Sequence, residues 1–272
     1  MDIEKMNLKK YLFQEVFKKL STFERKDFND NFTVEYTHDS TAIEGNTLTL
    51  TQTYMILTEG ITPAEISLKE LDEVRFHADA WDFVQKAKKD DLNMKREFIQ
   101  DIHQHVIKVD GVGGLFRTCP VYIRGSQHVP PAPEKLYDLM DNMVWEANHN
   151  KFNDPVHKAA WLHAKLTYIH PFLDGNGRTA RLLLNYELLS NGFPPTNIKS
   201  DNKQAYFDAL EEYNIHNNIR PFYELVYNYV DKTLDKFLSM YNQHISIQEL
   251  DFKSPAVGKL ARQYVPAKDL QK

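Results

Sequence analysis

Residues 170–181 read His-Pro-Phe-Leu-Asp-Gly-Asn-Gly-Arg-Thr-Ala-Arg, which indicates a tight loop that leads into a helix. The proline after His170 disfavours helical dihedral angles at the histidine, so a preceding helix should end there and present the imidazole. Two glycines permit a sharp turn and a close approach of the backbone to a ligand. We expect the next helix to begin near Asn176 or Gly177 and to run to Ser190.

The start of this helix combines several groups that suit a polyphosphate. Free backbone N–H groups and the positive end of the helix dipole form an anion site. Arg178, Arg181 and Asn185 share one polar stripe, opposite an apolar face that should meet a core. Asp174 is placed to hold a divalent cation, and His170 is a candidate base for a hydroxyl nucleophile. The alternative is an ordinary interhelical loop with solvated arginines. The convergence of these groups in one stretch favours an active site instead.

Helix signals dominate the rest of the chain. The sequence Thr-Pro-Ala-Glu at 62–65 joins a capping box to a proline at the first helical position. It predicts a helix that runs to about Lys89. Apolar residues at helical intervals, with capping and stop signals, predict further helices. These span about Leu92 to Val106, Asp154 to Ile169, and Ile219 to Tyr241.

Residues 118–133 differ from this helical pattern. Val121, Tyr122 and Ile123 stand in a row before Gly125 and a cluster of prolines, which predicts a small β-hairpin. Beyond about His244 the chain is polar and loses its periodicity, so we expect a loosely attached tail. We therefore expect an all-α fold with a small hairpin, divided into an N-terminal helical segment (1–60), a core domain (61–242) and a C-terminal tail (243–272).

The composition narrows the class of protein and its partners. A net charge of −5 argues against a general nucleic-acid binder. No window approaches the apolar length of a membrane span, and the charged N-terminus does not resemble a signal peptide. The single cysteine, Cys119, cannot form an internal disulfide, which favours a reducing compartment. We expect a cytoplasmic protein that binds neither nucleic acid nor membrane.

Residues 170–181 also resemble a known family. They match the Fic motif, His-Pro-Phe-x-Asp-Gly-Asn-Gly-Arg-x-x-Arg, at all nine specified positions. The resemblance extends less tightly from Phe32 to Tyr229. It implies the Fic fold, a helical core with a β-hairpin flap. It also implies transfer of AMP from ATP to a Ser, Thr or Tyr hydroxyl of a target protein.

The resemblance implies a role for each residue of the loop. His170 would deprotonate the target hydroxyl, and Asp174 would bind Mg²⁺ that bridges the phosphates. Arg181 would hold the γ-phosphate. The related Doc-type motif carries lysine at the Gly177 position and transfers phosphate, so glycine there favours AMP transfer. The α- and β-phosphates would be held by the rest of the loop and helix start: Gly175, Asn176, Gly177 and Arg178.

A second motif lies far upstream, at residues 40–46 (Ser-Thr-Ala-Ile-Glu-Gly-Asn). Taken alone, Ser40 and Glu44 form an i, i+4 polar pair on a solvated helix face that ends at Gly45. The stretch is similar to the Fic inhibitory motif, (Ser/Thr)-x-x-x-Glu-(Gly/Asn). This similarity implies that Glu44 pairs with Arg181 and displaces the γ-phosphate. The same carboxylate could instead position water for removal of AMP.

The resemblance also implies contacts with the target and with adenine. Residues 117–124 would form the flap that clamps a target chain through main-chain hydrogen bonds. The alternative for residues 117–124 is an ordinary surface hairpin. The alternative for Tyr206 and Phe207 is that they are ordinary core aromatics. Nucleotide-lining positions on the flap are Val121, Tyr122, Ile123 and Arg124, and adenine-contacting positions are Tyr206, Phe207 and Asn214.

Three functions therefore remain open from the sequence. The first is an AMP transferase restrained by Glu44, and the second is an enzyme that removes AMP with Glu44 as a catalytic group. The third is a binding or regulatory module that acts through the Tyr- and Phe-rich C-terminal helix. A homodimer is possible, since family members often dimerise. The spacing of His103, His105, His157 and His163 does not fit a metal site, so we expect structural histidines.

Overall fold

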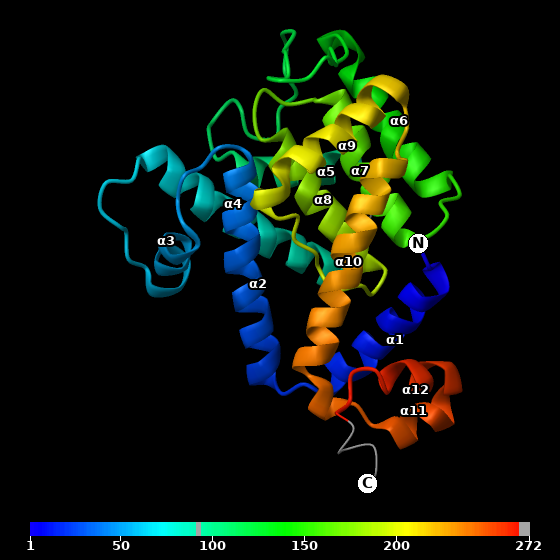
Figure 1. Cartoon of the computed structure of the whole chain (residues 1–272). Helices are drawn as coiled ribbons and strands as arrows, with labels where there is room; N and C mark the ends of the chain where they lie inside the picture. Colours follow the sequence, from blue (N-terminus) through cyan, green and yellow to red (C-terminus); the bar gives the residue numbers. More distant parts are fainter. Residues whose placement is uncertain (91–93, 267–272) are drawn as a thin grey trace.

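The computed structural model describes residues 1–90 and 94–266, and within them it is helical, with no strand assigned. Leu92, which the sequence assigns to a helix, lies outside the described residues. None of the described helices combines the length and apolar character needed to cross a bilayer. The helices, shown in Figure 1, are α1 (Ile3–Lys19), α2 (Thr22–Ile43), α3 (Leu50–Tyr54), α4 (Leu68–Lys89), α5 (Arg96–Val106), α6 (Leu136–His149), α7 (Pro155–Ile169), α8 (Asn176–Ser190), α9 (Lys203–His216), α10 (Arg220–Met240), α11 (Ile247–Lys253) and α12 (Pro255–Ala261).

Helix α8 lies at the centre of the fold and is buried on all sides (Figure 1). Helices α7, α4 and α5 pack against it, and two large apolar clusters meet on either side of it. The expected apolar face is present, with Ala180 and Leu183 fully buried. The expected polar stripe is buried too, because Arg178, Arg181 and Asn185 are at most 2% exposed. These polar groups therefore face interior partners rather than bulk solvent.

Local signals at the other helix ends are largely confirmed. Asp154 caps α7 by accepting hydrogen bonds from the N–H groups of residues 156 and 157, and Pro155 is the first helical residue. Helix α10 begins at Arg220 as expected. The expected start at 62–65 is wrong, because α4 begins at Leu68. There Ser67 forms a complete capping box with Glu70.

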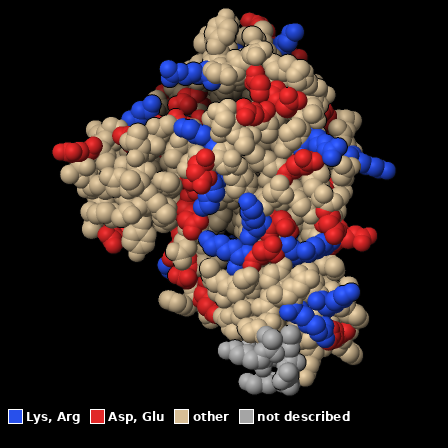
Figure 2. Space-filling model, in the orientation of Figure 1, with Lys and Arg blue, Asp and Glu red and all other residues tan. Residues whose placement is uncertain are grey.

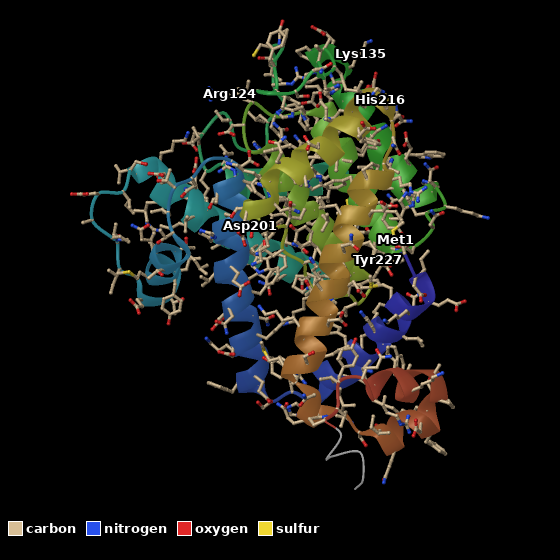
Figure 3. The ribbon with its side chains drawn as sticks, viewed as in Figure 1. Met1, Arg124, Lys135, Asp201, His216 and Tyr227 are labelled. Atoms are coloured by element: carbon tan, nitrogen blue, oxygen red, sulfur yellow. The ribbon has the colours of Figure 1, made fainter. Side chains whose placement is uncertain are left out.

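The β-hairpin expected in residues 118–133 is not seen. This segment is irregular, although its side chains alternate as in a strand: Val121 and Ile123 are half-buried, and Tyr122 and Arg124 are exposed. Arg124 stands at the surface (Figure 3). Proline lacks an N–H group, and the prolines that follow Val129 cannot donate to a partner strand.

The described part of the C-terminal segment, up to residue 266, is packed, in contrast to the loose attachment expected from its polarity. Helices α11 and α12 lie against α1 at one end of the molecule (Figure 1). Val257 and Ala261 are buried in the same apolar cluster as residues of α1 and α10. The division of the chain into three domains stays a prediction.

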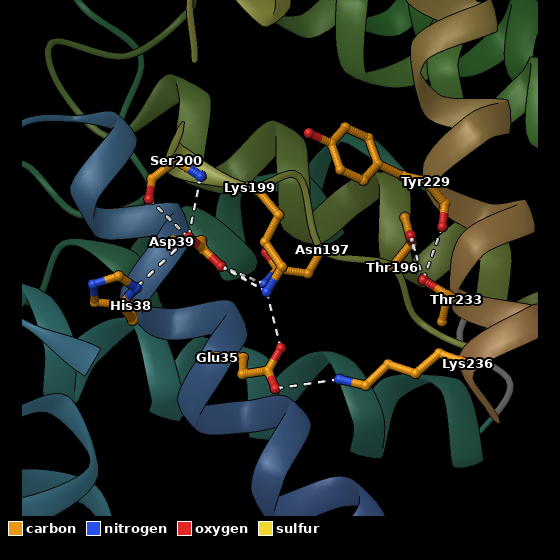
Figure 4. A network of polar contacts seen from close by, with 10 residues as sticks. All are labelled: Glu35, His38, Asp39, Thr196, Asn197, Lys199, Ser200, Tyr229, Thr233 and Lys236. Atoms are coloured by element: carbon orange, nitrogen blue, oxygen red, sulfur yellow. Dashed lines mark hydrogen bonds and ion pairs between the residues drawn. The ribbon is translucent and has the colours of Figure 1, made fainter. Parts of the chain in front are cut away.

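Helix α2 is fixed to the body of the protein by Asp39 (Figure 4). The buried carboxylate accepts hydrogen bonds from Asn197 Nδ2 at 2.6 Å, Lys199 Nζ at 3.1 Å and Ser200 Oγ at 2.8 Å. Burial opposes its ionisation, but hydrogen bonds from His38 and Ser200 and the charge of Lys199 hold the pKa of Asp39 well below its usual value. The contacts therefore fix the C-terminal turn of α2, which carries the second motif.

Candidate functional site

His170 follows the last residue of α7 in a left-handed conformation, with φ 48° and ψ 56°. Its Nδ1 atom lies 3.3 Å from the backbone oxygen of Thr167. A carbonyl oxygen only accepts, so Nδ1 carries the proton and Nε2 keeps its lone pair. Burial lowers the pKa of His170, which keeps the ring neutral at pH 7. The imidazole therefore has the tautomer and charge state of a general base.

Two side chains fix the backbone of the loop after His170. The Asn176 side chain accepts a hydrogen bond from the N–H of Phe172 at 3.0 Å and donates one to its carbonyl at 2.8 Å. Arg117 donates from Nε to the carbonyl of His170 at 2.8 Å and from its backbone N–H to that of Pro171 at 2.9 Å. The loop is thus held in shape without a ligand.

His103 also holds the loop that follows His170. Its Nδ1 accepts a hydrogen bond from the N–H of Gly114 at 2.9 Å, so Nε2 donates to the carbonyl of Asp174 at 2.9 Å. The ring is fully buried and stacks on Phe172 at 3.7 Å between centroids. Burial lowers the pKa of His103 to about 4. The expectation of a structural histidine is confirmed. Nothing in the sequence indicates that it holds the carbonyl of Asp174.

We expect replacement of His103 by alanine to lower the free energy of unfolding by about 3 kcal/mol, because a cavity and two unpaired buried groups remain. Urea denaturation followed by circular dichroism would measure the change. His216 is exposed at the end of α9 (Figure 3), so His216→Ala is the matched control and should cost less than about 0.5 kcal/mol. Equal stability of the two variants would contradict this role.

The N-terminus of α8 is open towards an anion. Gly175 is the N-cap residue with φ 76°, and no side chain of the described residues caps the helix. Its first N–H groups therefore remain available. The Asp174 side chain is 65% exposed, and its Oδ1 lies 3.3 Å from Arg178 Nη2. One exposed carboxylate beside a helix N-terminus is the kind of ligand that Mg²⁺ accepts, because this ion needs few protein ligands. No group of three or more potential ligands that could hold a metal by itself occurs in the described chain.

Arg181 is the buried centre of the site. Its Nη2 donates to Glu44 Oε1 at 2.7 Å and to the carbonyl of Ser40 at 2.7 Å, and its Nε donates to Ser40 Oγ at 2.9 Å. Burial opposes the charge, but Tyr206 and Glu44 raise the pKa of Arg181 above its usual value. The pairing of Glu44 with Arg181 that the second motif implies is therefore present, and Gly45 follows Glu44 with φ 103°.

Gly177 leaves the space that the Glu44 carboxylate fills. A Cβ atom at this position would lie 2.2 Å from Glu44 Oε1 and 3.1 Å from Arg181 Nη1. The first distance is far below van der Waals contact, so any side chain at 177 would displace Glu44. The Glu44 carboxylate thus occupies the space beside Gly177 that we expected the outer phosphates of a nucleotide to fill.

The three residues expected at adenine lie in different environments. Tyr206 is 1% exposed, accepts a hydrogen bond from Arg181 Nη1 at 3.1 Å and shares one with His163 Nε2 at 3.0 Å. It is therefore a partner of Arg181, a role the sequence did not indicate. Phe207 is 44% exposed and free to stack on a planar ring. Asn214 Oδ1 is buried without a partner among the described residues.

The segment expected to form the flap is anchored at both ends. Arg117 donates to the carbonyls of Cys119 and Pro131 at 2.9 and 2.5 Å, which closes the segment into a loop. On α9, Glu211 accepts hydrogen bonds from Ser126 Oγ at 2.5 Å and from the N–H of Gln127 at 2.6 Å. These contacts replace the strand pairing that the sequence suggested.

Comparisons with known proteins agree with this geometry. The chain is 37% identical over 208 residues to the protein adenylyltransferase Fic of Drosophila persimilis and 36% identical to that of Drosophila melanogaster. These alignments cover 75% of the chain but only 40% and 42% of the relatives, so the chain spans about two fifths of their length.

Solved structures share the fold. A Fic domain containing signaling protein from Bacteroides thetaiotaomicron has a TM-score of 0.80 at 27% identity, covering 90% of this chain and 99% of that one. Fic-1 from C. elegans (residues 134–508, E274G) has a TM-score of 0.74 at 29% identity, covering 86% and 71%. The model of the Fic/DOC family matches residues 93–188, which contain His170, Arg178 and Arg181. Residues 93–188 are therefore similar to the Fic/DOC family.

Proposed function

We propose that this chain is a protein adenylyltransferase that moves AMP from ATP to a Ser, Thr or Tyr hydroxyl of a target protein, and that Glu44 restrains it. The observation that carries the proposal is the neutral His170, with Nε2 free, beside the uncapped N-terminus of α8. Such a base and such an anion site are what attack of a hydroxyl on a phosphate requires. The similarity to adenylyltransferases over 75% of the chain supports it.

In the proposed reaction, the target oxygen attacks the α-phosphorus of ATP while its proton passes to His170 Nε2. The bond from the α-phosphorus to the bridging oxygen breaks, and pyrophosphate leaves with the electron pair. The N–H groups of α8 and Arg178 hold the α- and β-phosphates, and Arg181 holds the γ-phosphate. Mg²⁺ held by Asp174 would supply positive charge against the outer phosphates.

Further parts of the proposal concern the binding of the target and of adenine, the location of the protein and its oligomeric state. A target chain docks along residues 121–124, where Tyr122 is 85% exposed. Adenine lies against Phe207, with Asn214 as a hydrogen-bond partner. We also propose a cytoplasmic protein that can form a homodimer, in which residues 1–60 restrain the core.

A second candidate is removal of AMP by the same site. Glu44 favours it, because Oε1 is engaged by Arg181 while its side chain remains 35% exposed to water. The carboxylate would take a proton from water, whose oxygen attacks the phosphorus of an AMP-modified side chain. In this direction His170 would start with a proton on Nε2 and donate it to the departing hydroxyl oxygen as the bond from the phosphorus to that oxygen breaks. AMP and the free side chain are the products.

Labelled ATP separates the candidates. Glu44→Gly protein should incorporate label from the α-phosphate and none from the γ-phosphate. Incorporation from the γ-phosphate would show phosphate transfer and overturn AMP transfer. Wild type should then be given AMP-modified protein. Release of AMP by wild type that is lost in Glu44→Gly would establish the second candidate. The absence of both activities would leave the third function considered from the sequence, a binding or regulatory module.

A further inference from the structure

The charge of Arg181 lies in the interior of the protein, where only protein groups can solvate it. On the face of the molecule in Figure 2, by contrast, lysine, arginine and acidic side chains stand at the surface with both signs interspersed. The Arg181 side chain is only 2% exposed. Because water cannot stabilise a buried guanidinium, its position depends on the hydrogen-bond acceptors around it. Those acceptors therefore decide whether the group stays in place when one of them is lost.

Most acceptors of Arg181 lie on α2. Of the four hydrogen bonds that Arg181 donates to described residues, three end on this helix or on its C-cap residue. Nε and Nη2 reach the hydroxyl and the carbonyl of Ser40 at 2.9 and 2.7 Å, and Nη2 also reaches Glu44 at 2.7 Å. The fourth, from Nη1, ends on the Tyr206 hydroxyl at 3.1 Å. Tyr206 belongs to α9, so its contact does not depend on the position of α2.

The contacts to α2 are the ones that activation disturbs. In the proposed function a γ-phosphate displaces Glu44 from Arg181, and a shift of the last turn of α2 that withdraws Glu44 also moves Ser40. Tyr206 stays in place, because it is 1% exposed and packs edge-on against Phe222 with 5.9 Å between ring centroids. The guanidinium carbon of Arg181 also lies over the Tyr206 ring, 5.9 Å from its centroid, which adds a cation–π contact.

His163 of α7 orients the Tyr206 hydroxyl. Its Nε2 lies 3.0 Å from the hydroxyl oxygen, and the ring is fully buried. Arginine only donates, so the hydroxyl oxygen accepts from Arg181 and keeps its own hydrogen for another acceptor. Burial raises the pKa of Tyr206 to about 12, so that hydrogen is present at pH 7. Burial and the charge of Arg181 lower the pKa of His163 well below its usual value, so the ring is neutral and has one accepting nitrogen. If Nε2 carried the proton instead, the Tyr206 hydrogen would have no acceptor among the described residues.

We propose that Tyr206 is a positioning residue that sets the preference of this site for a nucleoside triphosphate. Its hydroxyl, oriented by His163, holds Nη1 of Arg181 and keeps the guanidinium beside the γ-phosphate after Glu44 has left. A nucleoside diphosphate has no γ-phosphate and gains nothing from this contact. The inference rests on the proposed function for the placement of the γ-phosphate, but its effect on binding can be measured without transfer.

The test removes one hydroxyl from the Glu44→Gly chain. Tyr206→Phe keeps the ring over Arg181 and deletes the hydrogen-bond acceptor. The probes are the α,β-methylene analogues of ATP and ADP, which cannot transfer AMP, and calorimetry with Mg²⁺ measures their affinities. We expect the ATP analogue to bind about tenfold more weakly and the ADP analogue to change by less than about twofold. An equal loss for both analogues, or no loss for either, would overturn the proposal.

Tyr227 provides the matched control. It is also a buried tyrosine, 8% exposed, whose hydroxyl accepts from the N–H of Asp2 at 3.0 Å and donates to the carbonyl of Asp2 at 2.7 Å. It lies on α10 near the N-terminus of the chain (Figure 3). Tyr227→Phe should therefore leave the ratio of the two affinities unchanged. A ratio that falls equally in both tyrosine variants would show a general loosening of the protein and contradict a specific role for Tyr206.

His163 supplies a second pair of variants, which decides the question even if Tyr206→Phe does not fold. His163→Leu leaves the Tyr206 hydrogen without an acceptor and should weaken the ATP analogue selectively. The side-chain carbonyl of His163→Gln can accept that hydrogen, so this variant should bind the ATP analogue more tightly than His163→Leu. Equal binding by the two variants would refute the orienting role of His163.

Kinetics give a further readout that a merely structural role would not produce. In Glu44→Gly, the added Tyr206→Phe change should raise KM for ATP about tenfold and leave kcat nearly unchanged, because the contact is made equally in the ground state and the transition state. A fall in kcat at constant KM would contradict positioning of the γ-phosphate.

The positioning role and the proposed function can fail separately. If Glu44→Gly transfers no AMP but Tyr206→Phe still weakens only the triphosphate analogue, the proposed function is wrong and the role of Tyr206 stands. If Glu44→Gly transfers AMP but binds both analogues equally, Arg181 does not hold a γ-phosphate, and the role of Tyr206 is refuted while the transfer reaction stands.

Discussion

Replacing Glu44 by glycine should raise the rate of AMP transfer about 10- to 100-fold. The carboxylate makes a partly buried, charge-assisted hydrogen bond of 2.7 Å to Arg181, and a bond of this kind contributes about 1.5–3 kcal/mol. A γ-phosphate must break it before it can reach the guanidinium. Glycine removes this competitor and also clears the space beside Gly177. The initial rate of incorporation of AMP from α-labelled ATP measures the effect.

A matched acid-to-glycine change separates this mechanism from a general loosening of the chain. Glu65 is exposed and has φ 62°, a conformation that glycine adopts readily. Glu65→Gly should therefore transfer AMP at the wild-type rate. If Glu44→Gly and Glu65→Gly label alike, Glu44 does not restrain the enzyme.

Removing the imidazole of His170 should have the opposite effect. In the Glu44→Gly background, His170→Ala should lower the rate about 100- to 10,000-fold, the range for loss of a general base. The structure gives the reason: Nδ1 is directed to the carbonyl of Thr167, so Nε2 is the atom available to take the proton of a hydroxyl. Nothing else in the loop is expected to replace it, because Arg178 is a cation and Asp174 is the carboxylate that we propose binds Mg²⁺.

The pH profile of Glu44→Gly tests the same assignment. Burial lowers the pKa of His170 below its usual value near 6.5, so the neutral base persists to lower pH than in a free histidine. The rate should be level around pH 7 and fall only as the pH drops below 6.5. His216→Ala should leave the profile unchanged. A rate that climbs steadily between pH 7 and 8 would argue against His170 as the base.

The parts of the fold that the sequence predicted are those set by neighbours along the chain. The end of α7 follows from the proline after His170, and the start of α7 follows from Asp154 and Pro155. The error at α4 has the same local origin. Residues 62–65 and 67–70 carry the same capping pattern, and only the second is used. A capping box marks a possible helix start, and packing of the following residues decides between two candidates.

The parts that could not be predicted depend on contacts between distant residues. The alternation at 121–124 is real, but no strand among the described residues faces it, and Arg117 and Glu211 hold the segment instead. In the site, the position of Tyr206 predicts a contact with adenine, which stays a prediction, while its hydrogen bond from Arg181 has no signal in the sequence. His103 lies 71 residues from the carbonyl that it holds. No spacing along the sequence reports such a contact.

The shared space at Gly177 predicts which mutations can release the enzyme. A library of random substitutions, selected for high AMP transfer, should yield changes at Glu44 and at its neighbour Ser40. It should not yield changes at Gly177, although any side chain there would also evict the carboxylate. The added atoms would occupy the room that a nucleotide needs, so restraint and activity would disappear together. Gain-of-function alleles should therefore map to the end of α2 and its C-cap residue and be absent from residues 170–181.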